Sequence, residues 1–150
     1  MQAMETVRIR IARLAPGVQI PDYFSADAAG MDLPAAVSEP IVIGPGEFHL
    51  VPCGFAVEIP RGFEGQVRPR SGLAGRHGVT VLNAPGTIDS DYRGEVKVLL
   101  INHGPAPFAV TAGMRIAQLV VARVARVDWE PVDVLTPSSR GEGGFGHTGS

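Results

Sequence analysis

The stretch IVIGPGEFHLVPCGFAVEIPRG, from Ile41 to Gly62, decides the fold class. Its apolar and β-branched residues fall into three short runs, Ile41–Ile43, Phe48–Val51 and Phe55–Ile59. Gly and Pro, which mark turns, stand between and after these runs. Short runs of this composition, bounded by turn residues, predict β-strands rather than helices.

The same pattern continues on both sides of this stretch. Val7–Leu14 alternates apolar and polar residues, which is the period of a half-buried strand. Gly17–Ala36 is expected to be mostly loop, and Ser71–His77 the one short helix. The other predicted strands are Gly65–Arg68, Val79–Leu82, Val96–Ile101, Phe108–Val110, Arg115–Val124 and Val127–Val134. Many short strands at this spacing predict an all-β fold, a jelly-roll-like barrel or sandwich.

Composition narrows the class further. The 150 residues suit a single domain, and 19 Gly with 13 Pro argue against long helices. Lys and Arg number 13 against 15 Asp and Glu, so the chain is not a generally basic nucleic-acid binder. The single cysteine, Cys53, excludes an internal disulfide and is expected to pack as a small apolar residue. No run approaches the length of a membrane span and no signal peptide is recognisable, so we expect a cytoplasmic protein without membrane contact.

The last fifteen residues, TPSSRGEGGFGHTGS, hold five Gly. They predict a flexible arm over residues 136–150 that follows a β domain over residues 1–135. The arm contains a literal G-x-G-x-x-G at 141–146, but a dinucleotide fold needs a strand before it and a helix after it, and neither is expected here. No P-loop sequence occurs, and the four His show no paired spacing, so a zinc site is not expected.

A first candidate site is the stretch RPRSGLA, Arg68–Ala74. Arg offers bidentate contacts to phosphate, and the start of a helix offers free backbone N–H groups to an anion. These residues therefore predict a phosphate-binding segment. The alternative is that Ser71 is an ordinary N-cap of an exposed turn.

A second candidate site is the stretch NAPGTIDSDYRGE, Asn83–Glu95. Pro85-Gly86 predicts a hairpin-like turn whose backbone amides, together with Asn83, can face the polar edge of a base. Asp89 and Asp91 would point to the same side of an extended segment, where either can activate water or hold Mg²⁺. The alternative is an acidic turn in which Asp has a capping role.

Five stretches of the chain, in order, resemble the five motifs of the trimeric dUTP pyrophosphatase (dUTPase) family, and the resemblance covers almost the whole sequence. They are AGMDL at 29–33, RSGLA at 70–74, GTIDSDYRGE at 86–95, GMRIAQ at 113–118 and RGEGGFGHTG at 140–149. The resemblance implies Mg²⁺-dependent hydrolysis of dUTP to dUMP and pyrophosphate by attack of water on the α-phosphorus. Such a reaction limits uracil incorporation into DNA and supplies dUMP for dTMP synthesis.

The resemblance also implies a role for each matching residue. Asp89 matches the catalytic carboxylate that deprotonates the attacking water, and Asp32 matches the residue that holds Mg²⁺ through a coordinated water. The implied substrate-binding residues are Arg70, Ser71, Gly72 and Gln118 on the phosphates, Asn83, Gly86, Thr87 and Ile88 around uracil, Tyr92 under the deoxyribose, and Arg140, Phe145 and Gly146 in the arm. Arg140 matches the γ-phosphate clamp, and Phe145 the ring that closes over uracil. Family sites form between subunits of a homotrimer, with the arm of a third subunit closing over each.

One departure and two alternatives remain. His147 stands where the family more often has a small hydroxyl residue, so that contact is open. A dCTP deaminase of the same fold family would place a catalytic Glu on the strand after Asp89, where the matching residue here is Leu99. A non-catalytic nucleotide-binding module would be expected to lack Asp89, Arg70 or the arm, and all three are present.

Overall fold

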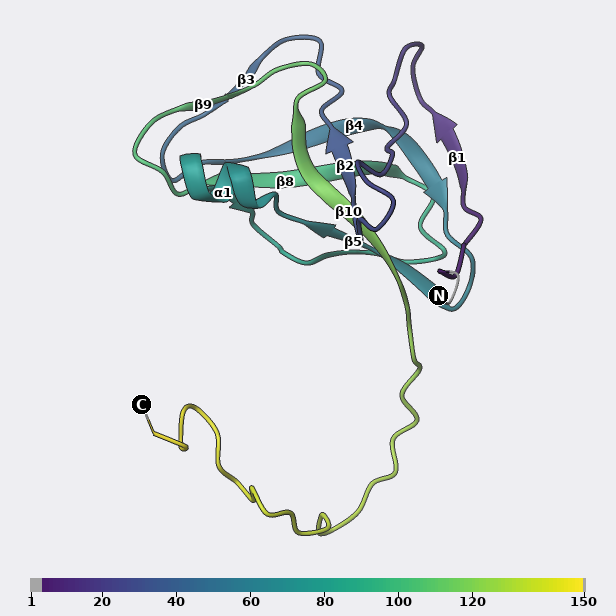
Figure 1. Ribbon diagram of the computed structural model, residues 1–150, viewed down its shortest axis with the longest axis vertical. Helices are drawn as coiled ribbons and strands as arrows, with labels where there is room; N and C mark the ends of the chain where they lie inside the picture. Colours follow the sequence, from purple (N-terminus) through teal and green to yellow (C-terminus); the bar gives the residue numbers. More distant parts are fainter. Residues whose placement is uncertain (1–3, 150) are drawn as a thin grey trace.

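The computed structural model describes residues 4–149, and within them the chain forms short strands and one helix (Figure 1). The elements are β1 (Arg10–Arg13), β2 (Met31–Pro34), β3 (Ile41–Ile43), β4 (Phe48–Glu58), β5 (Phe63–Arg68), α1 (Ser71–His77), β6 (Val79–Val81), β7 (Gly86–Ile88), β8 (Glu95–Asn102), β9 (Phe108–Val110) and β10 (Arg115–Arg123). Residues 1–3 and Ser150, at the outer ends of the expected domain and arm, lie outside the described residues. No helix among residues 4–149 is long and apolar enough to cross a membrane.

The strands form two four-stranded sheets and one two-stranded ribbon. One sheet has the order β1-β4-β8-β6, the other β2-β10-β5-β7, and β3 pairs with β9. Every pairing is antiparallel, and most neighbours are distant in sequence, as in jelly-roll connections. The all-β fold class predicted from the turn pattern is confirmed.

The core lies between the two sheets and follows the alternation of the strands. On β8, Val96, Val98 and Leu100 are buried, whereas Lys97 is exposed. Cys53 on β4 belongs to this core, as expected for a small apolar residue. Burial, with a smaller contribution from Glu95, raises the pKa of the Cys53 thiol to about 12, so the thiol stays neutral at physiological pH.

The central strand β4 is longer than the sequence indicated. The two runs at 48–51 and 55–59 belong to one strand, which pairs with β8 on both sides of an irregularity between Pro52 and Ala56. Gly54 sits in this irregularity with φ of 78°, a conformation that favours glycine. The Pro and Gly that suggested a turn therefore mark a bulge inside a continuous strand.

The segment 17–36 is mostly loop, as expected, and also contains the four-residue strand β2. The expected turn lies at residues 82–85, and β7, a strand of three residues that was not expected, begins directly after it at Gly86. The strand expected at Val127–Val134 does not form, because no other described segment pairs with it. Residues 124–149 instead leave the end of β10 as an extended segment that reaches away from both sheets (Figure 1). The division of the chain at residue 135 stays a prediction.

The helix expected at Ser71–His77 is confirmed, and its end packs directly on the turn that follows β8. Gly78 caps the helix with φ of 67°, and its carbonyl accepts the N–H of His103 at 2.9 Å. Asn102, fully buried, accepts the N–H of Gly104 at 2.8 Å. A Cβ on Gly104 would lie 3.0 Å from the carbonyl carbon of His77 and closer still to its oxygen. Backbone meets backbone here, so only glycine fits at position 104.

We expect Gly104→Ala to lower the free energy of unfolding by about 1–3 kcal/mol, the usual cost of forcing extra atoms into a packed site. Urea unfolding at fixed protein concentration measures the change. Gly75→Ala is the matched control: it lies inside α1, and an added Cβ meets nothing within 4 Å. That variant is expected to gain about 0.5–1 kcal/mol from helix propensity. Equal stability of the two variants would contradict the close approach at Gly104.

Candidate active site

Six of the residues singled out from the sequence line one cavity, here called the base pocket. These are Asn83, Gly86, Thr87, Ile88, Asp89 and Tyr92. The cavity has a volume of about 300 Å³ and lies where β7, at the edge of one sheet, comes near β8 of the other. The rest of its lining comes from Leu50, Val67, Glu95, Val96, Lys97 and Leu99. Of these, the sequence had indicated only Glu95, the end of the second candidate stretch, and Leu99, the position of the deaminase carboxylate. These residues are brought to the pocket by the packing of one sheet on the other.

β7 gives the base pocket a backbone wall. It pairs with β5 on one side, through Val67 and Gly86, and has no strand partner on the other side among residues 4–149. Its outer edge therefore leaves backbone N–H and C=O groups available for hydrogen bonds. A Cβ on Gly86 would lie 3.3 Å from both Val67 Cβ and Asn83 Nδ2, so this wall is tightly packed and a larger residue would have to displace its neighbours by a few tenths of an ångström.

Asp89 and Tyr92 stand on a tight turn that leads from β7 to β8. The N–H of Tyr92 donates to the carbonyl of Asp89 at 3.1 Å, and the Tyr92 hydroxyl donates to the carbonyl of Glu95 at 2.9 Å. The Tyr92 ring lies on Gly94, where a Cβ would be 2.6 Å from Cζ. Because the chain turns here, Asp89 lines the pocket and Asp91 does not. The expectation that Asp91 shares one site with Asp89 was wrong.

A second set of candidate residues surrounds the carboxylate of Asp32 on β2 and is here called the Asp32 cluster. Arg70 Nε lies 3.1 Å from Asp32 Oδ1, and Arg115 Nη1 lies 3.4 Å from Oδ2. Arg70 also donates to the carbonyl of Arg115 at 3.0 Å, and Gln118 Nε2 donates to the carbonyl of Pro69 at 3.0 Å. The cluster therefore presents two guanidiniums and one amide beside a single carboxylate.

Arg115 is the one member of the Asp32 cluster that was not predicted from the sequence as a site residue. Arg115 and Gln118 are three residues apart, so a regular strand would place them on opposite faces. A register shift between Arg115 and Ala117 adds one residue to β10, and both side chains then lie on the face of Asp32. In the sequence, the one signal for Arg115 was its place beside Gln118 in the GMRIAQ stretch. The bulge that brings both side chains to the same face depends on pairing with β2 and has no local signature.

Ser71 and Gly72 complete this end of the site at the start of α1. The N-cap of α1 is Arg70, with no side-chain cap, and Ser71 is the first helical residue. The alternative that Ser71 is an ordinary N-cap is therefore wrong. Ser71 is exposed and directly follows Arg70, the residue whose guanidinium pairs with Asp32.

The base pocket and the Asp32 cluster lie at opposite edges of one sheet. Asp32 stands on β2 and Gly86 on β7, and the order β2-β10-β5-β7 puts three strand spacings between them. At about 4.8 Å per spacing, this separation is about 14 Å. The arm residues Arg140, Phe145 and Gly146 belong to the terminal segment, which extends away from both sheets (Figure 1). Arg140 donates to the carbonyl of Gly143 at 2.7 Å, a contact within the arm.

The Asp32 cluster is suited to holding Mg²⁺ through water rather than by direct protein ligands. Mg²⁺ takes about six oxygen ligands and usually keeps several waters. Nowhere in residues 4–149 do three or more His, Cys, Asp or Glu gather around one point. Asp32 is a single carboxylate whose two oxygens each contact one guanidinium. Each oxygen has a second lone pair that can accept a hydrogen bond from metal-bound water. The remaining ligands would come from the substrate.

Comparison with solved structures gives the same fold. The chain resembles a variant of the dUTPase of Staphylococcus bacteriophage 80alpha with dUpNHpp, at 22% identity and a TM-score of 0.86, over 97% of this chain and 100% of that one. It also resembles a variant of the dUTPase from phage phi11 of S. aureus, described with a structural Mg(II) ion, at 20% identity and a TM-score of 0.76, over 85% and 97%. The sequence itself matches the family model for dUTPase over residues 17–149, which include all five motifs. This chain therefore belongs to the dUTPase family.

Proposed function

We propose that the base pocket of one copy and the Asp32 cluster of a second copy form one active site, which the arm of a third copy closes. As a dUTPase, the chain is a dUTP diphosphatase that hydrolyses dUTP to dUMP and pyrophosphate with Mg²⁺. The observation that carries the shared site is the separation of the two groups by the width of a sheet. A nucleoside triphosphate bound by both groups is more easily accommodated between copies than across one copy.

The base pocket suits uracil for steric and polar reasons. Gly86 is packed against Val67 and Asn83, so the wall leaves little space for the 5-methyl group of thymine. The free edge of β7 and the Asn83 amide match the alternating donors and acceptors of uracil, and the exocyclic amine of cytosine would leave groups unpaired. Sites built on such hydrogen bonds discriminate strongly. The Tyr92 ring, held on Gly94, would lie under the deoxyribose and exclude a 2′-hydroxyl.

Asp89 is the proposed general base. It lines the pocket, has an exposed side chain and follows directly after the uracil-facing strand, so it can hold a water beside the α-phosphorus. Arg70, Ser71, Gly72 and Gln118 would bind the phosphates and offset the charge that develops on them. Mg²⁺, held through water at Asp32, would supply further charge neutralisation to the triphosphate.

The segment before the arm supports a homotrimer. Five apolar side chains of residues 127–135 are more than half exposed within a single copy: Val127, Trp129, Val132, Val134 and Leu135. Apolar surface of this extent is typical of a contact with another chain. The cytoplasmic location and the absence of a nucleic-acid partner stay predictions.

The direct test is turnover of dUTP, dCTP, dTTP and UTP with Mg²⁺. Pyrophosphate is expected from dUTP almost alone. Leu99, at the position of the deaminase carboxylate, is an apolar residue of the pocket lining. Among the described residues, Glu95 is the one other carboxylate besides Asp89 in that lining. Ammonia released from dCTP would therefore assign a catalytic role to Glu95 and overturn the hydrolase, and equal turnover of dTTP would contradict the steric wall.

A further inference from the structure

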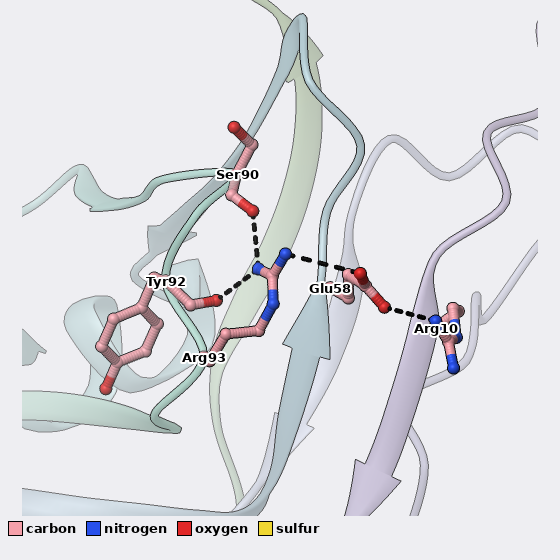
Figure 2. A network of polar contacts seen from close by, with 5 residues as sticks. All are labelled: Arg10, Glu58, Ser90, Tyr92 and Arg93. Carbon is pink, nitrogen blue, oxygen red and sulfur yellow. Dashed lines mark hydrogen bonds and ion pairs between the residues drawn. The ribbon is translucent and has the colours of Figure 1, made fainter.

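Arg93 holds together the turn that carries Asp89 and Tyr92. Its Nη1 donates to the carbonyl of Ser90 at 2.7 Å and to the carbonyl of Tyr92 at 3.0 Å (Figure 2). Hydrogen bonds from a charged donor are shorter and stronger than neutral ones. One guanidinium therefore fixes the main chain at two points between the two pocket residues.

The guanidinium is itself anchored from outside the turn. Arg93 Nη2 lies 3.5 Å from Oε1 of Glu58, the last residue of β4. Oε2 of Glu58 accepts a second contact at 3.0 Å from Arg10, its register partner on β1. Figure 2 shows these contacts as a chain that runs from the turn to the edge of the sheet. The turn is thus tied to a rigid element as well as to itself.

Arg93 lies outside the base pocket. Asp89 and Tyr92 both line the pocket, but Arg93 is not among its lining residues within the described chain. The Tyr92 ring points to the side of the turn away from the guanidinium (Figure 2). Arg93 is therefore placed to act through the main chain rather than on a nucleotide.

We propose that Arg93, held by Glu58, is a positioning residue for dUTP hydrolysis. It fixes the turn so that the Asp89 carboxylate faces the attacking water and the Tyr92 ring stays under the sugar. This inference rests on the roles proposed above for Asp89 and Tyr92. The Arg93 and Glu58 side chains are 54% and 41% exposed, so the pair adds little to global stability. Its effect is expected in the geometry of the turn.

The first test is Arg93→Met, which keeps an unbranched side chain and removes the donors. We expect kcat for dUTP to fall between about tenfold and about a hundredfold, as for small displacements of catalytic groups. The preference for dUTP over UTP should fall as well, because the ring that excludes the 2′-hydroxyl loosens. Thermal stability should stay unchanged, and Arg93→Lys should restore part of kcat. Unchanged kcat together with unchanged preference for dUTP would overturn the inference.

The second test, Glu58→Gln, separates positioning from a direct contact between Arg93 and the triphosphate. A positioning role predicts a lower kcat, because the guanidinium loses its anchor. A direct contact predicts tighter binding of dUTP, because the guanidinium is released toward the substrate, and that result would overturn the inference. Arg8→Met is the matched control for Arg93→Met and should leave kcat unchanged. Arg8 is exposed and precedes β1, and among the described residues its side chain has no hydrogen bond or ion pair.

The Asp89→Asn variant distinguishes this inference from the proposed function. An inactive Asp89→Asn beside a fully active Arg93→Met overturns the positioning role alone. A fully active Asp89→Asn overturns the proposed function on which that role rests. Loss of activity in both, with UTP discrimination reduced only in Arg93→Met, supports the two together.

Discussion

Replacing Asp89 by Asn is expected to lower kcat by about 10²–10⁴-fold, the range that a general base contributes. The amide keeps the size of the side chain but cannot take a proton from water. Asp89 is exposed and the described chain gives it no side-chain hydrogen bond, so the substitution should leave the turn intact. Steady-state hydrolysis of dUTP measures kcat, and titration with dUpNHpp measures whether nucleotide binding is retained.

Asp91→Asn is the matched control for this prediction. It removes the same charge two residues away, on the same turn, but from a side chain that does not line the base pocket. Its kcat should stay within about twofold of the parent, as for most exposed substitutions away from a site. A large loss in Asp91→Asn with little loss in Asp89→Asn would assign the base to Asp91.

Ending the chain at Ser139 is expected to lower kcat/KM by at least about 10²-fold, because the site loses a γ-phosphate cation and the ring that excludes water. The fold should not change. In the described residues, the hydrogen bonds of 140–149 run only within the terminal segment, and Phe145 is fully exposed. Sedimentation should give the same assembly as the full chain, because the apolar residues of 124–135 are kept. A truncated protein that sediments as a smaller species would show that the arm also holds the assembly together.

Co-expression of the truncated chain with the Asp89→Asn chain tests whether sites are shared between copies. Each protein alone should be nearly inactive. In mixed assemblies, a truncated copy supplies Asp89 and a neighbour supplies the arm, so about one quarter of the sites should be complete at equal expression. No recovery of activity would mean that each arm closes over the base pocket of its own chain.

Local patterns were sufficient for some elements and insufficient for others. Phe108–Val110 and Ser71–His77 formed as expected because turn residues bound them on both sides. The segment expected as a strand at Val127–Val134 alternates apolar and acidic residues around Pro131, but it has no partner among the described residues of one copy, and a strand without a partner is not stabilised. β7 was missed for the opposite reason. Pro85 and Gly86 indicate a turn and have weak strand preference, and the strand is held by its pairing with β5.

The sequence by itself determined the all-β class, the apolar packing of Cys53 and the chemical identity of nearly all candidate site residues. Those properties depend on residue type and on spacing along the chain. The tertiary structure decided which of these residues meet. A bulge in β10 brought Arg115 to Asp32, a tight turn separated Asp89 from Asp91, and the strand order placed the two halves of the site at opposite edges of one sheet. Each of these depends on pairing between segments far apart in sequence, which local composition does not encode.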